Sequence, residues 1–235
     1  MDKFDEKNRG IIDDSTLQRI KQLRLLIVGA GGIGGHLANH LVRLRVKAIH
    51  LCDYDIFQTS NLNRQLFSNL AVLGQRKVDV VARAISGIRP DVTIVSHPCS
   101  IEDIDSSIWE EIDIVLDAVD SIKTKLNLED MAKKHNLPLV HGAVAGWYGQ
   151  VGIIMPGQNV LHQFYKDEKH GLEKELASPT FIPSIIAGLI ISELIKYIQD
   201  QDKALVNQIM MVDVLNHDYQ TLSFNVLAKE KKKEQ

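Results

Sequence analysis

The most restrictive feature of this chain is a run of glycines that directly follows an apolar segment. Residues 25–34 read Leu-Leu-Ile-Val-Gly-Ala-Gly-Gly-Ile-Gly. The run predicts a buried strand over 24–29, a tight turn and a helix over 32–44. Such a turn binds phosphate, because glycine allows the sharp bend and lets phosphate oxygens approach the backbone N–H groups. The glycines of this predicted phosphate-binding turn are Gly29, Gly31, Gly32 and Gly34.

A carboxylate follows the next predicted strand. That strand covers 48–51, and Asp53 stands just beyond its end, where a carboxylate can accept a hydrogen bond from a ribose hydroxyl. Asp53 could instead cap a helix. A glycine turn followed by such an acid is typical of dinucleotide-binding oxidoreductases, so these two features alone would favour that class.

The polar run after Asp53 is not needed by an ordinary dehydrogenase. It contains Ser-Asn-Leu-Asn-Arg-Gln at 60–65, and Gly-Gln-Arg-Lys-Val follows at 74–78. Within these runs Arg64 and Lys77 stand thirteen positions apart. Two such cations can hold a triphosphate and neutralise the charge of a departing pyrophosphate, although either could be an ordinary surface residue.

With these motifs the chain resembles the ThiF/MoeB/HesA family, the bacterial relatives of ubiquitin-activating enzymes, over roughly residues 9–225. The resemblance implies an adenylyltransferase. In such an enzyme the carboxyl-terminal glycine of a small ubiquitin-like sulfur carrier, ending in Gly-Gly, attacks ATP and yields acyl-AMP and pyrophosphate. The resemblance also implies Mg²⁺ and a homodimer. The segment 177–183 before the last helix looks most like the ThiF branch, so we expect a role in thiamine biosynthesis.

The resemblance assigns roles to individual residues. Asp120, which follows the predicted strand 113–117, matches the aspartate that binds Mg²⁺, and a carboxylate is a suitable ligand for this ion. Arg9 matches an arginine that reaches across the dimer interface to the partner's ATP. Together with Arg64 and Lys77 these two form the expected catalytic set. Asp55 matches the second acid of the family pair and could equally orient the loop, and Asn61 matches a position near the phosphates or the metal. Ser60, Asn63 and Gln65 could contact the nucleotide or simply shape the loop.

At three positions the chain departs from the family pattern. Ser121 stands where an asparagine usually follows the metal-binding aspartate, and Lys125 stands where an arginine is common. Glu6 replaces the first arginine of the amino-terminal motif. The differences at Ser121 and Lys125 concern residues that surround the metal ligand, and Asp120 itself matches the family pattern.

The two cysteines, Cys52 and Cys99, form no Cys-x-x-Cys pair. We therefore expect no zinc site, no disulfide framework and a reducing, cytoplasmic setting. Both cysteines are expected to be buried. The segment 156–180 contains no cysteine that could join covalently to a carrier, so we assign no catalytic cysteine.

Apolar segments that alternate with helical patterns predict a doubly wound, Rossmann-like α/β fold. We expect a mixed sheet that is parallel in its amino-terminal part and antiparallel in its carboxyl-terminal strands. One domain should cover 1–235, with an arm and helix at 1–22, a mobile loop at 156–180 and a frayed tail at 228–235. Further strands are expected at 92–95, 113–117, 139–142, 147–155, 208–214 and 219–226, and helices at 74–88, 101–109, 123–135 and 181–198.

Composition narrows the function classes. With 45% hydrophobic residues, 24% charged residues and a net charge of −3, the sequence is typical of a globular protein without a basic nucleic-acid surface. The apolar stretch 185–191 is too short to cross a bilayer, so no membrane role is expected. The polar amino terminus does not have the pattern of a signal peptide.

Three alternative functions are weighed against adenylation of a carrier. An enzyme resembling tRNA threonylcarbamoyladenosine dehydratase would keep ATP but would need a basic surface. An NAD-dependent oxidoreductase would not need Arg64, Lys77 and Asp120 together. A non-catalytic binding protein of the same fold would have no reason to keep all three residues.

Overall fold

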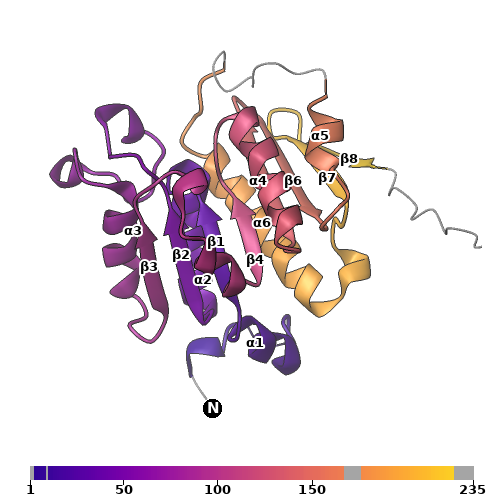
Figure 1. Cartoon of the computed structure of the whole chain (residues 1–235), viewed down its shortest axis with the longest axis horizontal. Helices are drawn as coiled ribbons and strands as arrows, with labels where there is room; N and C mark the ends of the chain where they lie inside the picture. Colours follow the sequence, from indigo (N-terminus) through magenta and orange to yellow (C-terminus); the bar gives the residue numbers. More distant parts are fainter. Residues whose placement is uncertain (1–2, 9, 167–175, 225–235) are drawn as a thin grey trace, which may run out of the picture.

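The computed structural model of the protein describes residues 3–8, 10–166 and 176–224. Within them the strands form one eight-stranded sheet in the order β3-β2-β1-β4-β5-β6-β7-β8 (Figure 1). The parallel strands are β1 (Arg24–Val28), β2 (Ala48–Cys52), β3 (Thr93–His97), β4 (Ile114–Asp117) and β5 (Leu139–Ala145). The antiparallel strands are β6 (Tyr148–Ile154), β7 (Gln208–Asp213) and β8 (Asp218–Ser223). The predicted mixed, doubly wound sheet is confirmed.

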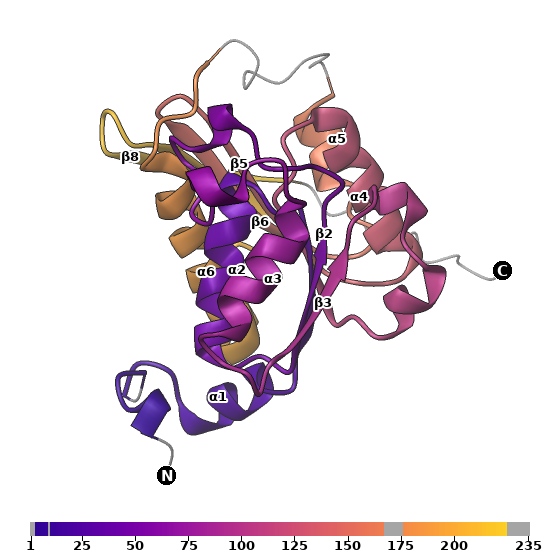
Figure 2. The same cartoon turned by 90° about the vertical axis from the view of Figure 1, so that its left-hand side faces the viewer.

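Helices cover both faces of this sheet (Figure 2). One face carries α2 (Gly32–Leu44), α3 (Lys77–Ser86) and α6 (Ile182–Gln199), and the other carries α4 (Ile122–Lys134) and α5 (Val160–Phe164). The short helix α1 (Asp14–Ile20) lies at the amino-terminal ends of the parallel strands (Figure 1). Short 3₁₀ helices occupy Lys3–Asp5, Thr59–Asn61, Leu70–Val72, Ile101–Asp103, Ser106–Glu110 and Gln201–Lys203.

The first strand shows why the apolar segments of this chain are continuous. Leu25 and Ile27 belong to the core between the sheet and α2, α3 and α6. Leu26 and Val28 belong to the core on the opposite face, beneath α4. None of the four is more than 3% exposed. Because helices cover both faces, both sets of side chains are buried and the strand needs no polar positions.

Helix α6 is long and apolar enough to cross a membrane when judged by these two properties alone. In the fold, half of it is buried. Ile186 and Ile190 lie against Gly149 and Gly142 of the sheet, where an added Cβ would come within 2.1 Å and 2.4 Å of their Cδ1 atoms. The missing side chains of these two glycines therefore let helix and sheet approach closely, and packing accounts for the apolar composition of α6.

Several predicted boundaries differ from the structure. The helix expected over 101–109 is replaced by two 3₁₀ helices, Ile101–Asp103 and Ser106–Glu110, and the strand expected over 92–95 runs from Thr93 to His97. The helix expected over 74–88 begins only at Lys77, because Gly74 adopts a φ of 80° in the preceding turn. The strand expected over 139–142 continues to Ala145, where it pairs with the start of β6. The last two differences reflect pairing and turn geometry that the local apolar pattern does not report.

The segment 156–180 was expected to be a mobile loop, and this is wrong for its first part, which contains α5. Two N–H groups in the first turn of this helix, at Leu161 and His162, each donate to the buried carboxylate of Glu129 at 3.0 Å. A helix of five residues shows little periodicity, so the sequence pattern did not distinguish it from a loop. The expectations that lie outside the described residues concern Arg9, the loop residues 167–175 and the tail at 228–235.

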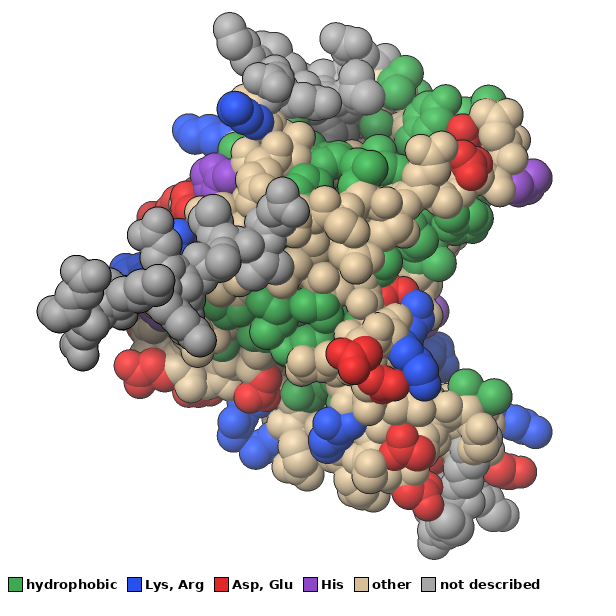
Figure 3. Space-filling view, turned by 90° about the vertical axis from the view of Figure 1, so that its right-hand side faces the viewer, with side chains coloured by type: hydrophobic (Ala, Val, Ile, Leu, Met, Phe, Trp, Pro, Cys, Tyr) green, Lys and Arg blue, Asp and Glu red, His purple; other side chains and the backbone are tan. Residues whose placement is uncertain are grey.

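Strand β8, the last strand of the chain, forms one edge of the sheet. All six of its residues are exposed, among them Tyr219 and Leu222. Figure 3 shows the side of the molecule on which α5, β7 and β8 lie, where hydrophobic side chains gather in patches between charged ones. An edge strand with exposed apolar side chains is a surface on which another polypeptide can dock.

Candidate active site

A cavity of about 580 Å³ opens at the carboxyl-terminal ends of the parallel strands. Its walls come from the segments that follow β1, β2, β3 and β4, and from residues 63–65 and 176–178. From β1 the sheet extends through β2 and β3 on one side, and from β4 it extends through β5 on the other side. Ligands of open α/β sheets bind at the carboxyl ends of the strands where the order reverses in this way.

The glycine turn lies at the base of this cavity, which Gly29, Gly31 and Gly32 help to line. Gly29 has a φ of 95°, and a Cβ at this position would lie 2.5 Å from the carbonyl oxygen of Ala118. Gly34 does not line the cavity. A Cβ on Gly34 would lie 1.7 Å from the carbonyl oxygen of Gly29, so this glycine lets α2 pack against the turn rather than a ligand approach it.

Asp53 joins the glycine turn to the loop after β2. Its two carboxylate oxygens accept hydrogen bonds from Ala30 N at 2.7 Å and Asp55 N at 2.8 Å. The residue also lines the cavity, where a ribose hydroxyl was expected to contact it. Asp53 therefore orders two loops of the site as well as presenting an acceptor to it.

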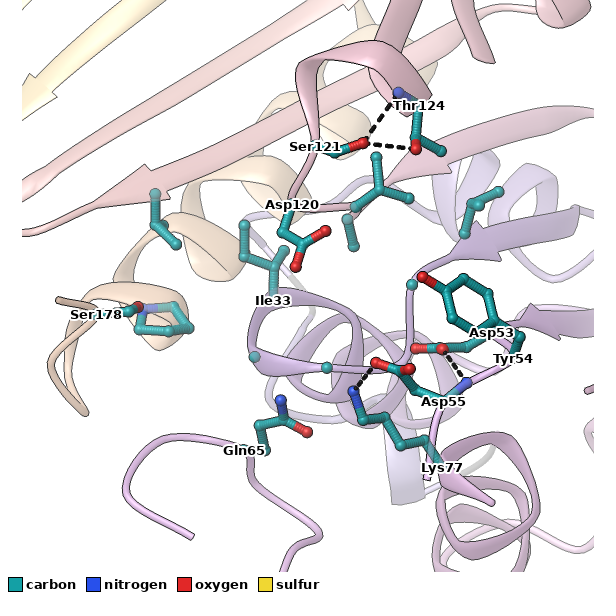
Figure 4. Close-up of a pocket in the computed structure, with 18 of the residues that line it drawn as sticks. Ile33, Asp53, Tyr54, Asp55, Gln65, Lys77, Asp120, Ser121, Thr124 and Ser178 are labelled. Atoms are coloured by element: carbon teal, nitrogen blue, oxygen red, sulfur yellow. Dashed lines mark hydrogen bonds and ion pairs between the residues drawn. The ribbon is translucent and has the colours of Figure 1, made fainter. Parts of the chain in front are cut away.

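Lys77 and Asp55 form an ion pair at the cavity wall, with 2.8 Å between Nζ and Oδ2 (Figure 4). Lys77 is the first residue of α3, and its backbone N–H donates to the carbonyl of Asp55 at 3.0 Å. Only 7% of the lysine side chain is exposed, against 51% for the aspartate. Asp55 thus holds the ammonium group of Lys77 beside the cavity.

Arg64 also lines the cavity, and its guanidinium is held by its own loop. Nη1 donates to the carbonyl of Ser60 at 3.0 Å and to Oδ1 of Asn63 at 2.9 Å. Asn63 in turn donates from Nδ2 to the carbonyl of Ser178 at 3.1 Å, which ties this loop to the far wall. Two cations from different loops therefore reach the same cavity.

Two other residues of this loop shape it without lining the cavity. Asn61 is 8% exposed, and its Oδ1 accepts a hydrogen bond from Gln58 N at 2.9 Å. Ser60 contributes its carbonyl to Arg64 and is exposed. For Ser60, of the two roles left open, the described contacts favour loop shaping. Asn61 was expected near the phosphates or the metal, but its side chain is held within the loop.

Gln65 and Ser178 carry polar atoms whose surroundings indicate a ligand site. Both residues line the cavity. Gln65 Oε1 and Ser178 Oγ are buried, yet neither has a hydrogen-bond partner among the described residues. Buried polar atoms without partners are costly, so a ligand that supplies the missing hydrogen bonds would be stabilised here.

Asp120 faces these groups from the other side of the cavity (Figure 4). It is exposed, and its carboxylate makes no hydrogen bond or ion pair with another described residue. Four carboxylates line the cavity, at Asp53, Asp55, Glu102 and Asp120, against the two cations Arg64 and Lys77. A polyanionic ligand would therefore need an additional cation, and Asp120 is free to bind one.

The two cysteines differ in exposure. Cys52 is buried, as expected, and its thiol donates to the carbonyl of Cys99 at 3.4 Å. Burial raises the pKa of the Cys52 thiol, so it is protonated and unreactive near neutral pH. Cys99 is only partly buried and lines the cavity, which corrects the expectation that both are buried.

The sequence matches a family model described as the ThiF family over residues 6–235. The chain belongs to the ThiF family. The family predicted from the polar runs and the glycine turn is thereby confirmed.

Curated relatives of this ThiF-family protein carry related names. The SAMP-activating enzyme E1 of Haloferax volcanii is 26% identical over 233 residues, which cover 94% of this chain and 86% of the relative. The probable adenylyltransferase/sulfurtransferase MoeZ of Mycobacterium tuberculosis is 26% identical over 220 residues, covering 88% of this chain. The match spans only 55% of MoeZ, so this chain corresponds to about half of that protein. These names support the predicted nucleotidyltransferase class.

Solved structures of the family share the fold. The crystal structure of Escherichia coli MccB with ATP has a TM-score of 0.73 at 18% identity, over 89% of this chain and 66% of the MccB chain. At this level of identity the likeness concerns the fold, and it agrees with the doubly wound sheet described above.

In this ThiF-family protein the sequence interpretation missed the part of the cavity wall that follows β3. Cys99, Ser100, Ile101 and Glu102 line the cavity although no motif marks them. The signal that could have found them is the one that identified Asp53 and Asp120, namely a position directly after the carboxyl end of a parallel strand. Tyr54, 72% exposed at the rim, was also missed, and the neighbouring Asp55 raises its pKa, with burial and Asp120 adding to the effect.

The interpretation also overlooked a histidine pair. His36 and His40 lie four residues apart on α2, a spacing at which two histidines can share a metal ion. Burial lowers the pKa of both imidazoles. In the described ranges, however, no group of three or more histidine, cysteine, aspartate or glutamate residues is arranged to hold a metal ion. We assign the pair no ligand.

Proposed function

We propose that this ThiF-family protein adenylates the carboxyl-terminal glycine of a small ubiquitin-like sulfur carrier that ends in Gly-Gly. The observation that carries the proposal is a single cavity in which the glycine turn, Arg64, Lys77 and Asp120 meet at one edge of the sheet. Family membership and the names of the relatives support the same activity.

The cavity fits ATP in size and in chemistry. Its volume of about 580 Å³ lies within the range of small-molecule sites, roughly 300–1,000 Å³. The glycine turn offers backbone N–H groups to phosphate, and Asp53 offers an acceptor for a sugar hydroxyl. Gln65 and Ser178 supply polar atoms that have no hydrogen-bond partner among the described residues. These features support ATP as the nucleotide.

Asp120 would hold the Mg²⁺ that accompanies ATP. When bound, this ion would offset charge on the phosphate oxygens and on the departing pyrophosphate. The excess of carboxylates over cations in the cavity supports a metal-bound nucleotide over a free one.

The chain's own residues would act mainly by positioning and by charge. A carboxylate oxygen of the carrier attacks the α-phosphorus, the bond to the bridging oxygen breaks, and its electron pair leaves with pyrophosphate. Arg64 and Lys77 would neutralise that leaving group. The attacking carboxylate is already ionised at neutral pH, so no general base or thiol is required. This agrees with a Cys52 thiol that is buried and protonated.

A protein substrate is supported by the surroundings of the cavity. Its wall near α6 is formed by small or apolar side chains, at Val144, Leu176, Ala177 and Pro183, which would suit a glycine tail. The exposed edge strand β8 offers a surface for the folded part of a carrier. For the pathway we propose thiamine biosynthesis, on the resemblance of 177–183 to the ThiF branch.

Calorimetry with ATP and Mg²⁺, and separately with NAD, tests the nucleotide. We expect ATP to bind and NAD to bind weakly or not at all, because Arg64 and Lys77 provide for a triphosphate. ATP–pyrophosphate exchange that depends on a candidate carrier tests the reaction. Tight binding of NAD together with no binding of ATP would overturn the proposal.

A further inference from the structure

Three buried ionisable side chains lie beneath the loop that carries Asp120, and the chemistry proposed above does not use them. Asp117, Lys125 and His141 each have a side-chain exposure of 0%. Removing charges from water is costly, and an apolar trio of similar volume would often be equally stable. Stability alone therefore does not account for a buried charged trio at this place.

The Asp117 carboxylate is surrounded by donors. Lys125 Nζ lies 3.2 Å from both of its oxygens, and His141 Nδ1 lies 2.7 Å from Oδ2. The backbone N–H of Val119 donates to Oδ1 at 3.1 Å. Burial acts to raise the pKa of Asp117, but the Lys125 ammonium and the His141 hydrogen bond more than offset this and hold the pKa below its usual range. An ionised carboxylate can only accept, so His141 donates from Nδ1.

This carboxylate anchors the loop between β4 and α4. Asp117 ends β4, and Asp120 follows three residues later. The backbone N–H of Ala118 donates to β1, and that of Val119 donates to Asp117. The Ser121 hydroxyl accepts a hydrogen bond from the first turn of α4. The backbone on both sides of Asp120 is therefore fixed, while its carboxylate stays exposed to the cavity.

The support continues into neighbouring elements. Lys125 donates to the carbonyl of Gly142 in β5 at 2.8 Å. His141 Nε2 lies 3.2 Å from Oε1 of Gln150 in β6, and the same oxygen accepts a hydrogen bond from the Tyr165 hydroxyl at the end of α5. The loop that carries Asp120 thus rests on a buried network that joins two helices and three strands.

We propose that Asp117, held by Lys125 and His141, is a positioning residue that sets loop 118–121 so that the Asp120 carboxylate can bind a divalent cation opposite the glycine turn. The inference rests on the proposed function, since the cation concerned is the Mg²⁺ of ATP. Residues that orient a metal ligand typically change metal affinity by about 10- to 100-fold when they are replaced.

Calorimetry of ATP binding with and without Mg²⁺ tests this role without relying on activity. We expect Mg²⁺ to strengthen ATP binding by the wild-type protein, and Asp120→Ala to abolish this gain. Asp117→Asn should bind metal-free ATP as tightly as the wild type does. The factor by which Mg²⁺ strengthens ATP binding should be about tenfold or more smaller in this variant.

Glu193→Gln is the matched control. Glu193 is a buried carboxylate of α6 that accepts a hydrogen bond from Leu205 N and does not line the cavity. We expect this variant to lose thermal stability as Asp117→Asn does but to keep the full Mg²⁺ gain. An equal loss of the gain in Glu193→Gln would overturn a specific role for Asp117.

A second variant covers the case in which Asp117→Asn does not fold. The double variant Asp117→Asn, Lys125→Met removes both charges and leaves no unpaired buried ammonium. A folded variant with an unchanged Mg²⁺ gain would overturn the positioning role while leaving the proposed function intact. Failure of the wild-type protein to bind ATP would instead contradict the proposed function.

Discussion

Lys77 and Asp55 show how single residues of this site depend on one another. The lysine side chain is nearly buried, whereas half of the aspartate side chain is exposed. Because the ammonium is held at 2.8 Å by Asp55, its orientation is set before a ligand arrives. A phosphate oxygen would then meet an ordered donor, and little side-chain entropy would be lost on binding.

Asp120 should be essential for adenylation and dispensable for folding. We expect Asp120→Ala to lower carrier-dependent pyrophosphate exchange by at least about 100-fold, because charge on the leaving group would no longer be offset. The melting temperature should change little, since the side chain is exposed and has no partner among the described residues. Asp202→Ala, an exposed aspartate outside the cavity, should leave both properties unchanged. Near-normal exchange by Asp120→Ala would exclude this residue as the metal ligand.

At the scale of elements, α2 packs tightly against the glycine turn. Gly34 lies in the first turn of α2, directly against the carbonyl of Gly29. The helix can therefore follow the strand without a side chain between them. This brings the amino-terminal end of α2, with its free N–H groups, to the floor of the cavity.

Gly34→Ala tests this contact. The added methyl would lie 1.7 Å from the Gly29 carbonyl oxygen, so turn and helix must separate. We expect the free energy of unfolding to fall by about 2–3 kcal/mol, with weaker ATP binding. Gly188→Ala is the control, because a Cβ there meets nothing within 4 Å, and it should gain about 0.5–1 kcal/mol. Urea titration measures both, and equal stability of Gly34→Ala and the wild type would contradict the packing argument.

At the scale of the whole molecule, the described residues of the amino-terminal arm, 3–8 and 10–13, lie far from the cavity of their own chain. Phe4 lies against Arg89, with 4.0 Å between the guanidinium carbon and the ring centroid, and Asp5 forms an ion pair with Lys21 at 2.6 Å. These contacts hold the described part of the arm near α1, at the amino-terminal ends of the strands (Figure 1). The cavity is at the opposite ends.

On the family resemblance, we propose a homodimer in which Arg9 acts on the partner's ATP. If so, mixing Arg9→Ala with Lys77→Ala should restore part of the lost exchange activity. Each mixed dimer would hold one site with both cations and one with neither, and the parental dimers would limit recovery to a fraction of the wild-type rate. Absence of recovery, with subunit exchange demonstrated by mass spectrometry, would place Arg9 in its own subunit's site or outside any site.

Several site positions could be identified from local motifs. Gly29, Gly31 and Asp53 were predicted to lie at a ligand site, and all three line the cavity. Gly29 and Asp53 directly follow parallel strands, and Gly31 lies in the turn between β1 and α2. Strands of this kind are recognisable from continuous apolar runs. Asn61 and Gly34, matched by the same motifs, line no part of the cavity. The Asn61 side chain is buried within its own loop, and Gly34 packs α2 against the turn.

The sequence was sufficient for features that depend on neighbouring residues: the alternation of strands and helices, the glycine turn, and the polar runs that indicate the family. These follow from periodicity and from the backbone freedom of glycine, which act within a few residues. Contacts between distant segments were decided by the folded chain. Asn63 meets Ser178 across 115 positions, and Lys125 meets Gly142 beneath the site across 17. Such meetings depend on the order of the strands and the docking of helices on them, and a local pattern contains neither.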